Sequence, residues 1–141
     1  MHRQPFSILM ADDDLEDLEL LEAAIRDQHT NATFHKVTSG RAVLRLLKGL
    51  HEKDLPCLIV LDYNMPELTG AEVLVELAKS TRYQWVAKVI LSTSNSPGYV
   101  KECRNLGAID YLVKPTSLVG MREVVHKLMT YCERTGPSPG K

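Results

Sequence analysis

The polar residues that are best suited to chemistry each follow a short apolar run. They are Asp12 to Asp14, Asp62, Ser92 to Ser94 and Lys114. Carboxylates that are brought together repel one another, so they either share protons or hold a cation, and hard oxygen ligands of this kind suit Mg²⁺. A carboxylate can also attack phosphorus and form an acyl phosphate, whose oxygens a cation, an ammonium and a hydroxyl would stabilise. These residue types therefore allow phosphoryl transfer to an aspartate if the fold gathers them.

Asp62 is the most informative of these residues, because it ends the apolar run 58–61, where a buried charge is costly unless something compensates it. The others have simpler readings when taken alone. Asp12 to Asp14 are typical of a helix N-cap and acidic first turn, and Asp14 is the expected cap. Lys114 alone is typical of a solvated loop lysine. Lys114 is a candidate site residue only if the fold places it near Asp62.

The elements that must position these residues alternate along the chain. Strand-like apolar runs cover residues 6–11, 33–37, 57–61, 88–92 and 109–113, and segments with apolar residues at helical spacing follow them. The last segment carries a stripe that we expect to dock on the sheet: Leu118, Met121, Val125, Leu128 and Cys132. Strands that are apolar on both faces predict a parallel sheet covered by helices on both sides. The chain is thus predicted to be a doubly wound α/β domain, which binds ligands beyond the carboxyl ends of its strands.

Length and composition favour one domain, residues 1–134, followed by a flexible tail, residues 135–141. The chain has 141 residues, 44% of them hydrophobic, and its net charge of −1 gives no indication of nucleic acid or an anionic membrane as a partner. Its apolar runs are too short to span a bilayer or to act as an export signal. Three distant cysteines suggest neither a disulfide nor a zinc site, so a cytoplasmic location is expected.

Three stretches together resemble the receiver domains of bacterial response regulators, of which the chemotaxis regulator is a small example. The stretches are Asp12-Asp13 after the first strand, residues 61–66 with Gly70 following, and residues 107–115. The likeness covers nearly the whole chain. It implies a (βα)5 flavodoxin-like fold, in which a five-stranded parallel sheet of order 2-1-3-4-5 carries helices on both faces.

The resemblance also implies roles for the strand-end residues. Asp62 would accept the phosphoryl group. Asp13 would bind Mg²⁺ directly and Asp12 through water, while the backbone carbonyl of Asn64 would complete the protein ligands. Lys114 would pair with the phosphate. The protein would then be no enzyme towards other molecules, because it would catalyse only its own phosphorylation and dephosphorylation.

Switching is expected to depend on a hydroxyl and an aromatic residue. Ser92 stands at the family's switch position, although Thr93 becomes the switch residue if the loop is shifted by one. Tyr111 falls at the switch aromatic position and would turn inward when Ser92 moves; an ordinary half-buried strand tyrosine is the simpler reading. A cis bond to Pro115 would fix the loop that carries Lys114.

The resemblance implies a histidine kinase as the phosphoryl donor. Residues 50–56 and 92–106 are similar to single-domain regulators paired with bacterial phytochrome kinases, so a bacteriophytochrome is one expected kinase. We expect no output domain, and the signal would pass to an unidentified downstream protein or phosphorelay component. Monomer and homodimer, the latter through the fourth helix, fifth strand and fifth helix, both stay open.

Parts of the sequence also fit three other functions. A haloacid-dehalogenase-type phosphatase would use Asp12 and Asp14, but it leaves Asp62 unexplained and finds Glu16 where its motif wants Thr or Val. A calcium loop fails because Asp17 stands where Gly is needed. A degenerate receiver that only binds partners would keep the fold without the chemistry, yet all the site positions are filled.

Overall fold

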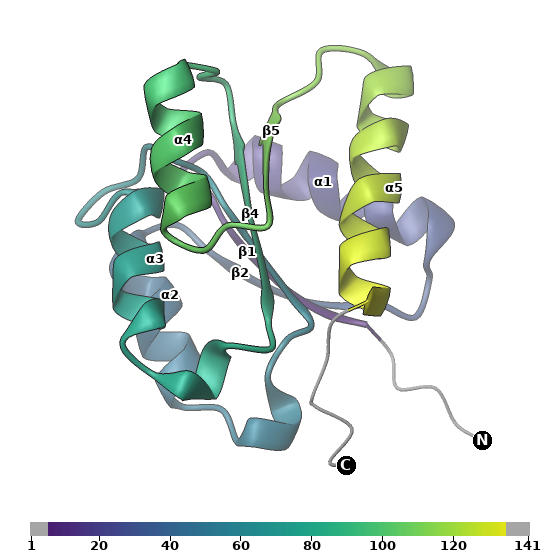
Figure 1. Ribbon diagram of the computed structural model, residues 1–141. Helices are drawn as coiled ribbons and strands as arrows, with labels where there is room; N and C mark the ends of the chain where they lie inside the picture. The colour runs from purple at the N-terminus through teal and green to yellow at the C-terminus, as the bar shows by residue number, and fades with distance from the viewer. Residues whose placement is uncertain (1–5, 135–141) are drawn as a thin grey trace.

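The computed structural model describes residues 6–134, which form a parallel sheet between two layers of helices (Figure 1). The strands are β1 (Ser7–Ala11), β2 (Thr33–Val37), β3 (Leu58–Leu61), β4 (Ala87–Ser92) and β5 (Asp110–Val113). The helices are α1 (Leu15–Gln28), α2 (Gly40–Lys48), α3 (Gly70–Ala78), α4 (Pro97–Asn105) and α5 (Leu118–Arg134). Short 3-10 helices, Glu52–Asp54 and Thr81–Tyr83, precede β3 and β4. The strand order β2-β1-β3-β4-β5 confirms the predicted topology.

Each face of the sheet packs against its own set of helices. α1 and α5 cover one face, and α2, α3 and α4 cover the other, as Figure 1 shows. All four residues of the central strand β3 are buried, because helices lie on both of its sides. This burial explains why the strand is apolar throughout, with no alternation of polar residues. The edge strand β2 has no fully buried residue.

Helix ends carry the caps that their residue types indicate. The Asp14 carboxylate accepts a hydrogen bond from the backbone N–H of Glu16 (2.9 Å), which confirms Asp14 as the N-cap of α1. Thr69 and Glu72 form a reciprocal capping box at the start of α3. Pro97 is the first residue of α4, where a missing N–H costs nothing. Because of these caps, the loops at the carboxyl end of the sheet enter their helices at defined residues.

The predicted docking stripe of α5 is only partly correct. Val125, Leu128 and Cys132 are buried against the sheet, but Leu118 is 78% exposed. The chain extends beyond the end of β5 before it turns into α5 (Figure 1), so the first turn of the helix lies past the strand ends. Leu118 has the right spacing but no sheet beneath it.

The prediction that the cysteines do not pair is wrong. Cys57, just before β3, and Cys132, in the last turn of α5, form a disulfide whose Cα atoms are 5.1 Å apart, a separation that is normal for such a bond. Seventy-five positions separate the two residues in the sequence. Only the packing of α5 over the sheet brings them together, so no local sequence pattern could reveal the pair. Cys103 is a free, buried cysteine.

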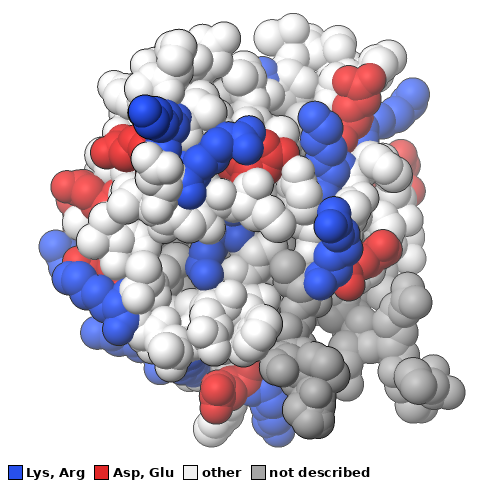
Figure 2. Space-filling view, in the orientation of Figure 1, with Lys and Arg blue, Asp and Glu red and all other residues white. Residues whose placement is uncertain are grey.

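Surface charge follows the balanced composition. On the face shown in Figure 2, Lys and Arg side chains are interspersed with Asp and Glu side chains, and neither sign dominates. No helix in the described part of the chain combines the length and the apolar character needed to cross a membrane. The predicted tail, residues 135–141, lies outside the described residues.

Candidate phosphoryl-acceptor site

Parallel pairing of the strands brings the predicted site residues to one edge of the sheet. Ala11 at the end of β1 is in register with Leu61 at the end of β3, so Asp12 and Asp62 leave the sheet side by side. The backbone N–H of Asp62 donates to the Ala11 carbonyl at 2.9 Å. On the other side of β3, the Lys114 N–H donates to the Ser92 carbonyl at 2.8 Å and continues the ladder between β4 and β5.

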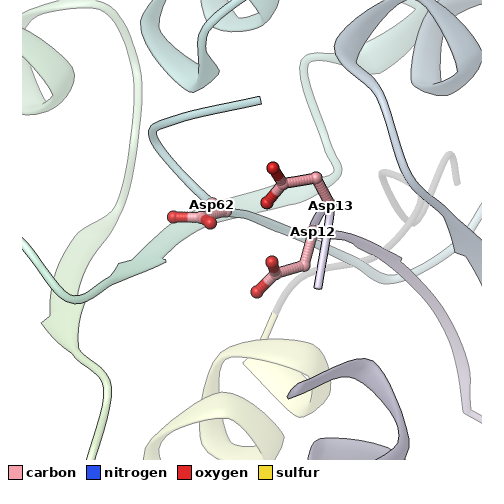
Figure 3. Close-up of side chains that lie close together, drawn as sticks. All are labelled: Asp12, Asp13 and Asp62. Atoms are coloured by element: carbon pink, nitrogen blue, oxygen red, sulfur yellow. The ribbon is translucent and has the colours of Figure 1, made fainter. Parts of the chain in front are cut away.

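Asp12, Asp13 and Asp62 form an acidic cluster. One carboxylate oxygen from each lies within 4.8 Å of the other two, and Figure 3 shows the three side chains close together and extending to the same side. Asp12 and Asp62 are buried, whereas Asp13 is exposed. Three oxygen donors with one open side fit a small divalent ion such as Mg²⁺, which takes few protein ligands and keeps several waters. The residues present therefore suit the predicted cation.

Lys114 supplies positive charge to this cluster. Its ammonium nitrogen lies 2.6 Å from Asp12 Oδ2, 2.7 Å from Asp17 Oδ2 and 3.4 Å from Asp62 Oδ2. Burial works against the charge of Lys114, but the hydrogen bonds to Asp12 and Asp17 outweigh burial and raise its pKa. Lys114 is therefore fully charged and shared among three carboxylates.

Asp17 is a site residue that sequence reasoning missed. It lies in the first turn of α1, where an acidic residue is explained by the helix dipole alone. Asp12 directly follows β1, and Asp17 lies five residues later in the first turn of α1. That spacing was a usable signal, but its meaning depends on Lys114, which is 97 positions away.

Burial raises the pKa of Asp12 to about 6. That value already includes two opposing effects: hydrogen bonds from Lys114 and from the Asp14 backbone N–H lower the pKa, and the neighbouring charge of Asp62 raises it. Without a cation, Asp12 therefore loses its proton at a higher pH than an ordinary aspartate, as expected for carboxylates that share one site.

The two residues expected to act in switching are Ser92, at the end of β4, and Tyr111, in β5. Ser92 is completely buried at the end of β4, and its Oγ accepts a hydrogen bond from the Ser94 backbone N–H at 3.3 Å, whereas Thr93 is exposed. The hydroxyl of Tyr111 donates to the Ser94 carbonyl at 2.6 Å, and the ring is buried. Tyr111 already points inward here, so no further turn is needed to bury it. The geometry favours Ser92 over Thr93 as the hydroxyl nearest the core.

The loop after β3 is tightly constrained. Asn64 lies exposed in it, two residues beyond Asp62. Glu67 has a φ of 74°, and around it the Leu68 N–H donates to the Pro66 carbonyl at 2.8 Å, which is a strained γ-turn. Gly70 follows because an added Cβ there would lie 2.6 Å from the Asp62 carbonyl oxygen. The close approach of α3 to Asp62 therefore requires glycine.

Tyr63 connects the loop after Asp62 to α4. Its ring stacks on Tyr99 with centroids 4.1 Å apart, and its hydroxyl donates to Glu102 at 2.8 Å. Burial, followed by the hydrogen bond to Glu102, raises the pKa of Tyr63, so the phenol remains a donor. The sequence did not single out Tyr63, because an aromatic residue after a strand is usually only packed.

One predicted detail of the Lys114 loop is wrong. The Lys114–Pro115 peptide bond is trans, since the described residues contain no cis peptide bond. An X–Pro bond prefers trans by only about 0.5–1 kcal/mol, so the residue types alone do not decide the isomer. The surrounding loop decides it.

The arrangement also bears on the phosphatase alternative. That function requires Asp12 and Asp14 to act together, but Asp14 caps α1, and the described cluster consists of Asp12, Asp13 and Asp62. A phosphatase of this type would not explain why Asp62 lies in the cluster. The structure therefore does not favour that function.

Comparisons with known proteins identify the family of the chain. Residues 8–126 match the family model of the response regulator receiver domain. The two-component response regulator ORR12 of Oryza sativa subsp. japonica is 30% identical over 119 residues, which cover 84% of this chain and 94% of the relative.

Two solved structures share the fold. The phosphorylated cyanobacterial phytochrome response regulator RcpA matches with a TM-score of 0.83 at 24% identity, covering 96% of this chain and 99% of that chain. The Mn²⁺-bound response regulator Rcp1 matches with a TM-score of 0.79 at 25% identity over the same shares. With the strand order, the acidic cluster and the family model in agreement, the chain belongs to the response regulator receiver domain family.

Proposed function

We propose that this protein is a response regulator whose receiver domain accepts a phosphoryl group on Asp62. The observation that carries the proposal is the surroundings of Asp62, whose carboxylate lies in one cluster with Asp12 and Asp13 and 3.4 Å from the Lys114 ammonium. An Asp62 oxygen attacks phosphorus, the bond from phosphorus to the donor breaks, and the leaving group takes the bonding electrons. No proton has to be removed from the nucleophile, so the step depends on charge stabilisation.

Several residues around Asp62 would stabilise the charge of the phosphoryl group. Asp13, Asp62 and the Asn64 backbone carbonyl would hold Mg²⁺ directly, with Asp12 acting through water. When bound, the ion supplies positive charge to the phosphoryl oxygens. Lys114 approaches the same oxygens, and their charge of about −1.5 to −2 draws it away from its present partners.

Ser92 would carry the change to the surface. Its hydroxyl moves towards the phosphoryl oxygens, which alters the space next to Tyr111 and shifts the balance between two arrangements of α4, β5 and α5. Tyr99, Val113 and Val119 expose apolar surface in this region. We propose it as the surface for a downstream protein, a phosphorelay component or a second copy of the chain.

Receiver domains work with histidine kinases in two-component systems, so the proposed phosphoryl donor is a histidine kinase in the cytoplasm. The likeness to RcpA and Rcp1 supports a bacteriophytochrome as that kinase. Towards other molecules the protein would be no enzyme, and its turnover would be limited to its own phosphorylation and dephosphorylation.

Acetyl phosphate and Mg²⁺ provide a direct test. Intact mass measurement should show one labile phosphoryl adduct on the wild type, none on Asp62→Asn and an undiminished adduct on Asp14→Asn, because the Asp14 side chain caps α1. Chelation of Mg²⁺ should abolish labelling. Labelling of Asp62→Asn together with its loss in a Asp12→Asn variant would instead support the phosphatase. Size-exclusion chromatography of the labelled samples would report any dimer.

A further inference from the structure

The ion pair between Asp17 and Lys114 has no part in the function proposed so far. Asp17 comes from α1 and lies outside the cluster of Asp12, Asp13 and Asp62 that could hold a cation. Its Oδ2 nevertheless lies 2.7 Å from the Lys114 nitrogen, closer than that of Asp62 at 3.4 Å. Lys114 is thus held more tightly by α1 than by the acceptor residue.

The competing partners of Lys114 differ in what happens to them when the site is loaded. Asp12 lies in the acidic cluster, so a cation bound there neutralises part of its charge and weakens its hold on Lys114. Asp62 becomes the phosphorylated group itself. Asp17 is outside the cluster and keeps its full charge, so it remains as the competitor for the ammonium.

We propose that Asp17 is a positioning residue that holds Lys114 back from the phosphoryl group and thereby limits the rate of phosphorylation. This inference rests on the proposed function of Asp62. Lys114 has three N–H donors, and the two shortest contacts point to Asp12 and Asp17. The third donor is available for a phosphoryl group, but the nitrogen lies 3.4 Å from Asp62 and 2.7 Å from Asp17. Movement of Lys114 towards the phosphoryl group therefore lengthens the Asp17 contact, and the strength of that contact adds to the barrier. Loss of this contact leaves the atoms that react unchanged, because the oxygen of Asp62 still attacks phosphorus and acetate still leaves with the bonding electrons.

The size of the effect follows from the exposure of the pair. The Asp17 side chain is 34% exposed and that of Lys114 is 16% exposed, so solvent screens the interaction considerably. Partly exposed ion pairs of this kind correspond to about a 2- to 5-fold change in an equilibrium or a rate. We expect Asp17→Asn to be phosphorylated by acetyl phosphate about 2- to 5-fold faster than the wild type.

Glu16→Gln is the matched control. Glu16 is the neighbouring residue in the same helical turn, and its substitution removes the same charge, but Glu16 is not one of the three carboxylates that contact Lys114. Asp17→Glu, which restores the charge, should return the rate towards the wild-type value. Thermal unfolding of each variant checks that the fold is intact, and if Asp17→Asn does not fold, Asp17→Ser takes its place.

A binding measurement and a double mutant separate positioning from a general charge effect. The affinity for beryllium fluoride with Mg²⁺, measured by calorimetry, should rise by the same factor in Asp17→Asn and stay unchanged in Glu16→Gln. In a Lys114→Ala background, Asp17→Asn should have no effect on either quantity. Equal effects of Asp17→Asn and Glu16→Gln, or an effect that persists without Lys114, would overturn the inference. If the wild type is not labelled at all, the proposed function fails, whereas a labelled wild type with an unaltered Asp17→Asn variant refutes only the role of Asp17.

Discussion

At the scale of single residues, the chemistry of the site depends on how a buried carboxylate is kept charged. Asp12 is only 6% exposed, and burial raises its pKa from 3.8 to about 6. The folded protein therefore binds a proton at Asp12 that the unfolded chain has lost. Between these two pKa values, the stability of the metal-free protein falls as the pH rises. Lys114 reduces this penalty, and a bound cation is expected to remove it.

This pKa predicts a pH-dependent difference between the wild type and Asp12→Asn. In metal-free protein, the variant should gain up to about 2 to 3 kcal/mol relative to the wild type between pH 4 and pH 7, because only the wild type must ionise a buried carboxyl over that range. Urea unfolding in the presence of a chelator measures the difference. Titrating groups outside the cluster of Asp12, Asp62 and Lys114 cancel in the comparison. A difference independent of pH would contradict the raised pKa, and saturating Mg²⁺ should stabilise the wild type more than the variant.

At the scale of elements, α4 is attached to the end of β3 through the residue that follows Asp62. Tyr63 is buried at the end of β3, while its partners Tyr99 and Glu102 lie on α4. α4 begins without a side-chain cap, and in the part of the chain that the structure describes only Cys103 of this helix is fully buried. The stacked tyrosines are therefore a large share of what holds this helix in place.

Tyr63→Phe and Tyr63→Leu should separate the two contributions. Tyr63→Phe removes only the hydrogen bond to Glu102 and should lower the free energy of unfolding by about 1 kcal/mol. Tyr63→Leu also removes the stacking on Tyr99 and should lower it by about 1 kcal/mol more. Urea unfolding measures both variants. Glu102→Ala combined with Tyr63→Phe provides the control, because each change alone removes the hydrogen bond and the two effects should be less than additive if the bond is real.

At the scale of the whole molecule, one covalent link joins the start of β3 to the end of α5. The Cys57–Cys132 disulfide closes a loop with a sequence separation of 75 residues. In the chain-entropy view, such a link stabilises the fold by restricting the unfolded chain, and long loops gain the most. A reducing cytoplasm keeps thiols reduced, so in the proposed location the protein would work with this link open.

Reduction should therefore change stability without changing the fold. A thiol reductant is expected to lower the free energy of unfolding of the oxidised protein by about 2 to 4 kcal/mol. Cys57→Ser, which cannot form the link, should show no response to the reductant. Urea unfolding with and without reductant measures both proteins. Equal stability of the wild type under the two conditions would mean that the pair does not form a disulfide in solution.

The fold class, the strand positions to within about a residue and the residues that follow the strands were all predictable from the residue pattern. Those residues are Asp12, Asp13, Asp62, Ser92 and Lys114. These features are readable because strand burial and helix capping depend on residues that are close in the chain. The parallel register then brings the strand ends to one edge whatever the loops do.

Five other features depend on how the folded chain packs. They are the Asp17–Lys114 ion pair, the contact of Tyr63 with α4, the Cys57–Cys132 disulfide, the exposure of Leu118 and the trans bond before Pro115. The three pairings join residues that are 36 to 97 positions apart and depend on how helices dock on the sheet. The other two depend on where a loop places its ends, and the free-energy differences involved are too small for residue types alone to settle.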